Sequence, residues 1–151
     1  MKELIKTGEI IVQYETKPHY LITKSYMEKN LNAQEKEWFP RYAYPISDEV
    51  WAFWSDKPKE WTPINHSCDP NAWLDGLNMI ARRDILPGME ITMDYATFMN
   101  EQMPSFACEC HSPLCRKNIH GTDYQLPGMD IYTGHFSDYI AHKRQDFQKK
   151  R

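Results

Sequence analysis

The chain has 151 residues, of which 41% are apolar, enough for one domain whose hydrophobic core needs no disulfide bonds. No stretch approaches the roughly 20 consecutive apolar residues that span a bilayer, and the segment from Met1 lacks the apolar run of a secretory signal. The net charge of −3 excludes a generally basic nucleic-acid-binding protein. We therefore expect a soluble intracellular protein without membrane contact or direct nucleic-acid binding, in the nucleus or cytoplasm of a eukaryote or the cytoplasm of a bacterium.

The first part of the chain predicts a strand followed by short helices. A turn leads into the β-branched segment 10–14, which is typical of a strand and ends at Tyr14. Ser25 and Asn32 are each followed three residues later by a glutamate, which is the pattern of a capping box. We expect one or two short helices between Ser25 and Phe39.

An aromatic run at 50–54 lies between polar and helix-breaking residues, which favours a strand. Tryptophans stand within this run and close to it, at positions 51, 54, 61 and 73. We interpret them as core residues, the usual place of large aromatic side chains. The alternative is that they stack on an adenine ring or wall an apolar channel.

The middle of the chain contains two clear turn signals. Segments 72–74 and 77–81 flank Asp75-Gly76, a dipeptide that strongly indicates a β-hairpin. Pro87-Gly88 predicts a type II turn before a strand at 91–95. Short strands joined by turns predict a domain that is mainly β, with short helices.

Three of the four cysteines crowd into a single loop, at Cys108, Cys110 and Cys115. Thiols two residues apart make strained disulfide partners, whereas thiolates about 2.3 Å from one zinc ion converge easily from a tight loop. In a reducing compartment we favour the metal over the disulfide.

The end of the chain predicts a helix that packs back on the domain. Phe136, Tyr139, Ile140 and Phe147 have the spacing of one helix face. The basic residues near this end, Lys143-Arg144 and 149–151, are interpreted as a solvated helix face and a frayed tail.

Three motifs carry a resemblance to a known family. The run Asn65-His66-Ser67-Cys68-Asp69-Pro70-Asn71 resembles the N-H-S-C-x-P-N signature of SET-domain protein-lysine methyltransferases. Segment 90–95 resembles their E-[IL]-T-x-D-Y motif, and segment 108–115 matches their C-x-C-x4-C post-SET zinc motif. The resemblance implies a β-clip-like SET-domain fold, in which small sheets surround a knot-like crossing where the first two motifs meet. A C-terminal zinc-binding post-SET segment and a terminal helix would follow.

The resemblance also implies a role for each site residue. Tyr95 would be the catalytic tyrosine, and Asn65 and His66 would contact S-adenosylmethionine together with Tyr95. Tyr14 would wall the channel for a protein or peptide lysine; the alternative is a strand aromatic in the core. A structural Zn²⁺ would be held by four thiolates, those of Cys68, Cys108, Cys110 and Cys115. Asparagines in the signature, such as Asn65 and Asn71, could also cap turns with their own side chains.

The resemblance divides the chain into an expected SET domain at 1–100, a post-SET zinc segment at 101–121 and a helical C-terminal extension at 122–151. The family's upstream glycine-x-glycine cofactor motif does not occur, so we expect a shortened chain. The first hypothesis is an S-adenosylmethionine-dependent protein-lysine N-methyltransferase. The alternative is a zinc-stabilised SET-like module that binds peptides or proteins without transferring methyl groups.

Overall fold

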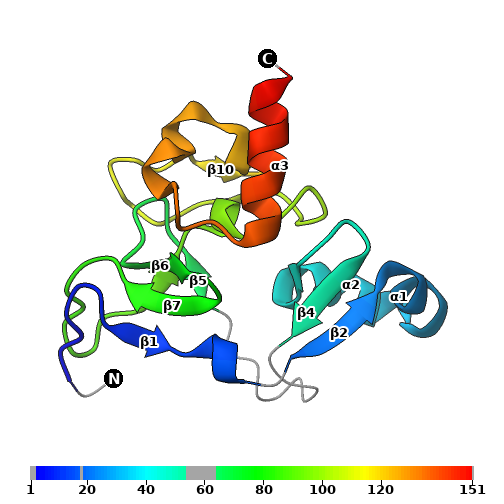
Figure 1. The fold of residues 1–151 in the computed structure, drawn as a ribbon, viewed down its shortest axis with the longest axis horizontal. Helices are drawn as coiled ribbons and strands as arrows, with labels where there is room; N and C mark the ends of the chain where they lie inside the picture. Colours follow the sequence, from blue (N-terminus) through cyan, green and yellow to red (C-terminus); the bar gives the residue numbers. More distant parts are fainter. Residues whose placement is uncertain (1–2, 18, 54–63, 151) are drawn as a thin grey trace.

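The structure is a computed structural model that describes residues 3–17, 19–53 and 64–150. Within these residues ten short strands form four small sheets (Figure 1). The strands are β1 (Ile10–Val12), β2 (Tyr20–Thr23), β3 (Tyr44–Pro45), β4 (Val50–Phe53), β5 (Asn65–His66), β6 (Ala72–Asp75), β7 (Asn78–Ala81), β8 (Thr92–Met93), β9 (Phe106–Ala107) and β10 (Asn118–Ile119). The α-helices are α1 (Lys24–Asn30), α2 (Ala33–Tyr42) and α3 (Asp138–Lys149). The 3-10 helices in the described segments are η1 (Tyr14–Thr16), η3 (Tyr95–Thr97), η4 (Asp123–Gln125) and η5 (Pro127–Tyr132).

This architecture confirms the prediction of a mainly β fold with short helices. In Figure 1 the sheet β1-β7-β6 lies at the lower left and the strands β2 and β4, with helices α1 and α2, at the lower right. Helix α3 stands above them. Within the described part of the chain, every helix is too short or too polar to cross a membrane.

The first sheet is built around the predicted hairpin. Strands β6 and β7 are antiparallel, and Asp75 pairs with Asn78, so the two-residue loop is Gly76-Leu77 rather than Asp75-Gly76. Gly76 has a φ of 59°, a value that residues with a Cβ rarely adopt, which explains why the glycine begins the loop. The turn at Pro87-Gly88 is confirmed, because Met89 N donates to Leu86 O and Gly88 has a φ of 84°.

The predicted strand at 10–14 is shorter in the structure. Strand β1 ends at Val12, and Tyr14 begins the 3-10 helix η1 instead of continuing the strand. The register of β1 against β7 shifts between Ile10 and Val12, which takes the chain out of the ladder before Tyr14.

The second sheet, ordered β2-β4-β3, carries α1 and α2. Helix α2 begins with the predicted capping box, in which Asn32 and Glu35 bond each other's backbone N–H groups. The predicted box at Ser25 is wrong, because the Thr23 side chain caps α1 by accepting from Tyr26 N at 3.1 Å. Thr23 occupies the end of β2, a strand the sequence did not reveal. Strand β4, which pairs with β2, confirms the predicted strand over residues 50–53, and position 54 lies outside the described residues.

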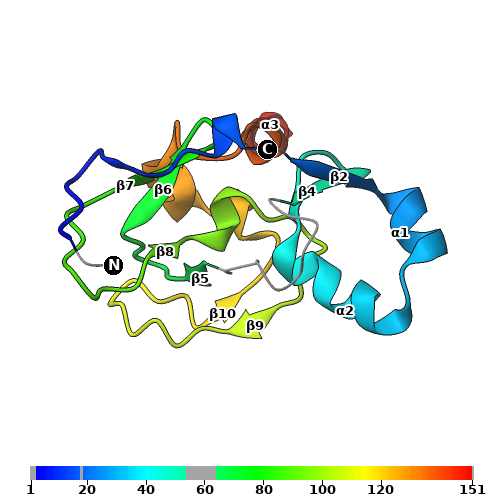
Figure 2. The same cartoon turned by 90° about the horizontal axis from the view of Figure 1, so that it is seen from below.

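Strands β5 and β8 bring the two signature motifs together as a parallel pair. Asn65 lies opposite Thr92, and His66 lies opposite Met93. The strand predicted at 91–95 is interrupted after Met93, because the Asp94 side chain accepts from Ala96 N at 3.1 Å and starts η3. Figure 2 shows β5 and β8 beside each other, with β9 and β10 next to them.

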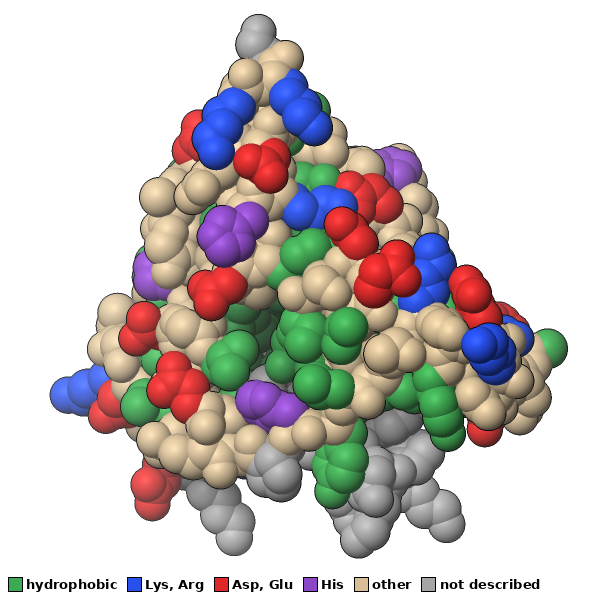
Figure 3. All heavy atoms as spheres, turned by 45° about the vertical axis from the view of Figure 1, so that its right-hand side comes forward, with side chains coloured by type: hydrophobic (Ala, Val, Ile, Leu, Met, Phe, Trp, Pro, Cys, Tyr) green, Lys and Arg blue, Asp and Glu red, His purple; other side chains and the backbone are tan. Residues whose placement is uncertain are grey.

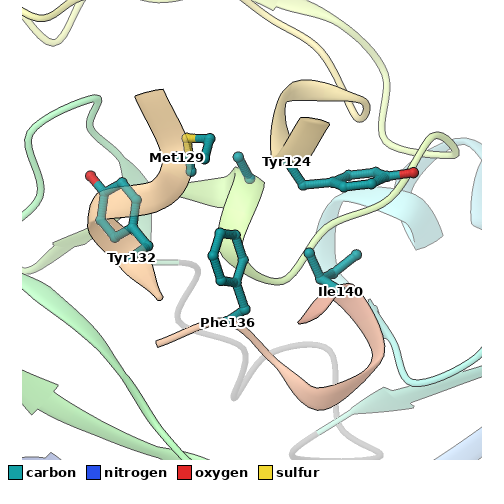
Figure 4. Close-up of a cluster of buried hydrophobic side chains, with 6 residues drawn as sticks. Tyr124, Met129, Tyr132, Phe136 and Ile140 are labelled. Carbon is teal, nitrogen blue, oxygen red and sulfur yellow. The ribbon is translucent and has the colours of Figure 1, made fainter. Parts of the chain in front are cut away.

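Helix α3 packs back on the domain as predicted, through a cluster with η4 and η5. Figure 4 shows Phe136 and Ile140 directed toward Met129 and Tyr124, and Ala96 of η3 belongs to the same cluster. The basic C-terminal end of α3 lies at the top of Figure 3. Below it is a face on which apolar side chains gather around a hollow.

One residue of α3 contradicts the solvated-face interpretation. Arg144 is only 5% exposed, and its guanidinium donates to the carbonyls of Tyr124 and Leu126 and pairs with Asp130. Tyr124 lies in η4 and Leu126 directly follows it, so this buried arginine joins α3 to the end of η4. Lys143 is also engaged, at 2.9 Å from Glu101 and 3.3 Å from Asp48.

We predict that Gly121→Ala destabilises the protein. A Cβ at Gly121 would lie 2.7 Å from the carbonyl carbon of Asn100 and 2.8 Å from Cα of Glu101, both of which are backbone atoms. Overpacking of this kind typically lowers stability by about 1–3 kcal/mol, which corresponds to roughly 3–10 °C in the melting temperature. Gly128→Ala is the matched control, since nothing lies within 4 Å of the new Cβ. Thermal unfolding that shows the same loss for both variants would contradict the prediction.

Candidate functional site

The parallel pair β5 and β8 is fastened by a buried asparagine. Asn71 is 4% exposed; its amide donates to Glu90 O at 2.8 Å, and its carbonyl oxygen accepts from Thr92 N at 2.9 Å. The side chain therefore bonds backbone about twenty residues away instead of capping its own turn. This amide helps to hold the loop after β5 against β8, together with the bond from Ser67 N to Met93 O, and its loss would leave two backbone groups without a partner.

A cavity of about 560 Å³ opens where the two motifs face the cysteine segment. Asn65, His66 and Tyr95 line it from the motifs, and Phe106, Cys108 and Cys110 line it from the cysteine segment. The structure thus brings together the predicted cofactor contacts, the predicted catalytic tyrosine and part of the predicted metal site.

Tyr95 is held at three points. Its hydroxyl donates to Ile64 O at 2.8 Å, and its N–H donates to Nδ1 of His66 at 3.2 Å. Its ring contacts those of Phe98 and Phe106, with centroids 5.6 and 5.9 Å away. Burial raises the pKa of the Tyr95 hydroxyl, so it stays protonated at neutral pH.

His66 lies between Tyr95 and the cysteines. Burial lowers the pKa of His66 to about 4, so the imidazole is neutral at physiological pH. Because Nδ1 accepts the Tyr95 N–H, the ring proton is on Nε2, which lies 3.4 Å from Sγ of Cys68. The ring therefore faces the sulfur, and only 3% of the side chain is exposed.

Asn65 and Tyr14 differ in their relation to the cavity. Asn65 is exposed, and its Nδ2 donates to a carboxylate oxygen of Glu90, another lining residue, at 2.5 Å. Tyr14 does not occur among the described residues that line the cavity. It packs against the core cluster that contains Met79 and Met93, and burial raises its pKa. A role for Tyr14 in a lysine channel stays a prediction.

The four cysteines converge. Their Sγ atoms all lie within 4.8 Å of one another, and those of Cys68 and Cys108 are 3.9 Å apart. A tetrahedral zinc site with sulfurs about 2.3 Å from the metal places the sulfurs about 3.8 Å apart. The cluster is therefore compatible with zinc.

The turns of the cysteine loop allow this convergence. His111 and Lys117 have φ values of 53° and 68°, in the left-handed region that few residues other than glycine adopt. Cys108 N donates to Lys117 O at 2.7 Å, and Cys115 N donates to Ser112 O at 3.0 Å. These bonds close the loop so that the sulfurs point inward.

The thiols differ in their readiness to ionise. Burial raises the pKa of Cys68 to about 12. Burial also opposes the ionisation of Cys110, but hydrogen bonds from the backbone N–H groups of Cys68 and Ser112 lower its pKa to about 6. A thiolate at Cys68 requires a nearby positive charge, which a divalent cation among the four sulfurs would supply.

Arg116 is a central residue of the site that the sequence did not single out. Its guanidinium makes two hydrogen bonds of 2.7 Å to the fully buried carboxylate of Asp94 and a third, of 2.9 Å, to Asp123. Its backbone N–H lies 3.3 Å from Sγ of Cys68. The only signal in the sequence is its position directly after Cys115.

The tryptophans have no contact with the cavity where the structure describes them. Trp51 is 1% exposed in the core beside Phe39, as interpreted. Trp73 stacks on His135, with ring centroids 3.6 Å apart. Trp54 and Trp61 lie outside the described residues.

Comparison with known proteins relates this chain to a family and to several of its members. The profile described as "SET domain" matches residues 2–96. The chain is 27% identical over 125 residues to histone-lysine N-methyltransferase trithorax of Drosophila virilis, an alignment that covers 77% of this chain and 3% of that protein. It is 30% identical over 77 residues to histone-lysine N-methyltransferase ATX2 of Arabidopsis thaliana, covering 46% of this chain and 7% of that protein.

A third relative is histone-lysine N-methyltransferase ash1 of Drosophila melanogaster, 34% identical over 71 residues, covering 42% of this chain and 3% of that protein. The chain thus spans less than a tenth of the length of each of these relatives. The profile nevertheless covers well over half of the chain, including both signature motifs, and ends within η3, one residue after Tyr95. The resemblance of these motifs is confirmed, and the chain belongs to the SET domain family.

Proposed function

We propose that the protein transfers a methyl group from S-adenosylmethionine to the ε-amine of a lysine in a protein substrate. The observation that carries the proposal is the cavity at which both signature motifs and the cysteine segment meet around Tyr95. The relatives named above are histone-lysine N-methyltransferases, so histones are the first substrates to test. If they are the substrates, the nucleus is the expected compartment in a eukaryote.

The cavity suits S-adenosylmethionine in size and charge. Its volume is within the range of about 300–1,000 Å³ that is usual for small-molecule sites. The side chains of Glu90 and Glu109 line it, and no lysine or arginine occurs among the described lining residues. Bound there, S-adenosylmethionine would supply a methyl group already activated on a positively charged sulfur. Asn65 and His66 would hold it, the latter through its backbone because its ring faces Cys68.

The protein must present the lysine as a neutral amine. A free lysine has a pKa of about 10.4, so little of it is neutral at physiological pH. An apolar channel lowers this pKa by desolvation, and a nearby positive charge lowers it further. Solvent can then accept the proton. The Tyr95 hydroxyl, fixed by Ile64 O, would orient the amine, since correct placement of reacting groups supplies much of the rate.

We propose that Cys68, Cys108, Cys110 and Cys115 hold a structural zinc ion. Four thiolates leave no open coordination position, so the ion would not take part in the reaction. It would fix segment 101–121, the proposed post-SET segment, as one wall of the cavity. Metal binding and formation of the cavity would then be linked.

The zinc proposal predicts one zinc ion per chain in the purified protein. Cys110→Ser should lose the metal, and a strong chelator should lower the melting temperature, because zinc in such sites supplies folding free energy on the order of 10 kcal/mol. Elemental analysis and thermal unfolding measure both effects. Ser112→Ala, in the same loop but without a sulfur, should keep the metal. Metal-free protein that melts at the same temperature would exclude a structural zinc.

The proposed reaction predicts that Tyr95→Phe loses about 100-fold or more in kcat, since the amine is no longer oriented. Stability should change by only about 1 kcal/mol, the usual net value of one hydrogen bond. Labelled S-adenosylmethionine with core histones, followed by mass spectrometry of modified lysines, measures the rate.

Tyr132→Phe is the control for the tyrosine experiment. The Tyr132 side chain is only 1% exposed and so more deeply buried than that of Tyr95, but its hydroxyl has no hydrogen-bond partner among the described residues. Tyr132→Phe should therefore keep full activity. A Tyr95→Phe variant that is as active as Tyr132→Phe would contradict the role proposed for Tyr95.

The alternative, a SET-like binding module without methyl transfer, makes a different prediction for cofactor binding. Calorimetric titration with S-adenosylmethionine separates the two hypotheses. Saturable binding at cellular concentrations supports the enzyme, and the absence of binding supports the module.

A further inference from the structure

We infer that Arg116 is a positioning residue that couples the cysteine cluster to Tyr95. This inference rests on the proposed function, because it assigns Tyr95 to the reaction. Arg116 does not occur among the described residues that line the cavity; its contacts are with Asp94 and Cys68, and it would act through them.

The contacts form a closed ring. Arg116 N lies 3.3 Å from Sγ of Cys68, and the same sulfur lies 3.4 Å from Nε2 of His66. Nδ1 of His66 accepts from Tyr95 N at 3.2 Å. Asp94, the neighbour of Tyr95, closes the ring by accepting both hydrogen bonds from the Arg116 guanidinium. A shift of the sulfur is therefore passed to Tyr95 from two sides.

Asp94 sets the backbone at Tyr95. Its carboxylate caps Ala96 N at 3.1 Å, and its carbonyl accepts from Thr97 N at 3.0 Å, which together define η3. The carboxylate is fully buried, and a buried charge of this kind stays in place only when it is paired. Arg116 is the partner, so the turn that carries Tyr95 depends on it.

An arginine is required here by geometry. The planar guanidinium binds both carboxylate oxygens of Asp94 and presents Nε to Asp123. A lysine has the same charge but one nitrogen, so it cannot make the two-pronged contact.

The competing explanation is that Arg116 only anchors η4 through Asp123. The two contacts are made by different atoms of one side chain and can be weakened separately. Asp94→Asn weakens the contact with the Tyr95 turn, and Arg116→Lys weakens both contacts, because it also removes the Nε that bonds Asp123. Asp123→Asn weakens only the contact with η4. Arg83→Lys changes an arginine that pairs with Asp69 at the surface, and serves as a general control.

The experiment uses the whole chain loaded with zinc and reads two quantities. The first is hydrogen–deuterium exchange at the amides of residues 95–97, with and without a chelator. The second is kcat and the dissociation constant of S-adenosylmethionine. In the unmodified protein, chelation should speed exchange at Tyr95. Arg116→Lys and Asp94→Asn should speed it with zinc still bound and lower kcat about 10-fold or more, with the dissociation constant nearly unchanged. Asp123→Asn and Arg83→Lys should do neither.

Each outcome decides a separate point. If Arg116→Lys and Asp123→Asn lower only the melting temperature, and by similar amounts, Arg116 is an anchor for η4 and the inference is wrong. If exchange at 95–97 responds as expected but the unmodified protein transfers no methyl group, the coupling stands and the proposed function fails. If Arg116→Lys does not fold, Asp94→Asn gives the same comparison with the arginine retained.

Discussion

The structure depends on the convergence of Cys68 with three cysteines that follow it by forty or more residues. The segment that carries the three is poorly held by its own backbone, since β9 and β10 pair over only two residues each. A hairpin of this length is not stable alone in water. What fixes it is the sulfur cluster and the small core beneath it, in which Met99, Met103 and Ile119 pack against the cysteines. One wall of the cavity is therefore only as rigid as this cluster.

The rest of the fold is also held together mainly by side chains. Its sheets are small, and buried polar side chains join them in place of long strand ladders. Asn71 ties the first motif to the second, Arg116 ties the second to the cysteine segment, and Arg144 ties α3 to the loop after η4. Each link is a buried polar side chain with several partners. Such links are directional, and losing one partner leaves the others unsatisfied. A fold of this kind specifies the position of a few groups closely without a large single core.

The elements that the sequence predicted are those fixed by neighbouring residues. The capping box at Asn32, the turn at Pro87-Gly88 and the hairpin around Gly76 each depend on contacts within four or five positions. The hairpin was displaced by one residue because an aspartate followed by glycine fits a loop in more than one register. The cap at Ser25 failed because Thr23, two residues earlier, offers the same hydroxyl.

What the sequence did not predict depends on distant partners. Strand β2 pairs with β4, about thirty residues away, and two of its four residues are exposed apolar side chains that give no alternation. Arg144 and Arg116 appeared as ordinary charged residues, because their partners are carbonyls and carboxylates brought near only by the fold. The grouping of the four cysteines, which the structure shows as a cluster, was predicted because a family resemblance supplied the pairing of Cys68 with the later three. Spacing alone indicated only the three in one loop.

The charges of the site favour the proposed reaction through the combined effect of several residues. The charge of Arg116 is paired with Asp94, the neighbour of Tyr95, and with Asp123. His66 is kept neutral by burial, and Tyr95 is kept protonated. The cavity is left with the carboxylates of Glu90 and Glu109 and with the thiolates around any bound metal. A site from which the protein's own cations are withdrawn would suit a positively charged sulfur, and under the proposed reaction that charge would add to desolvation in lowering the pKa of an arriving lysine. The buried ion pair of Arg116 thus has an electrostatic consequence as well as a geometric one.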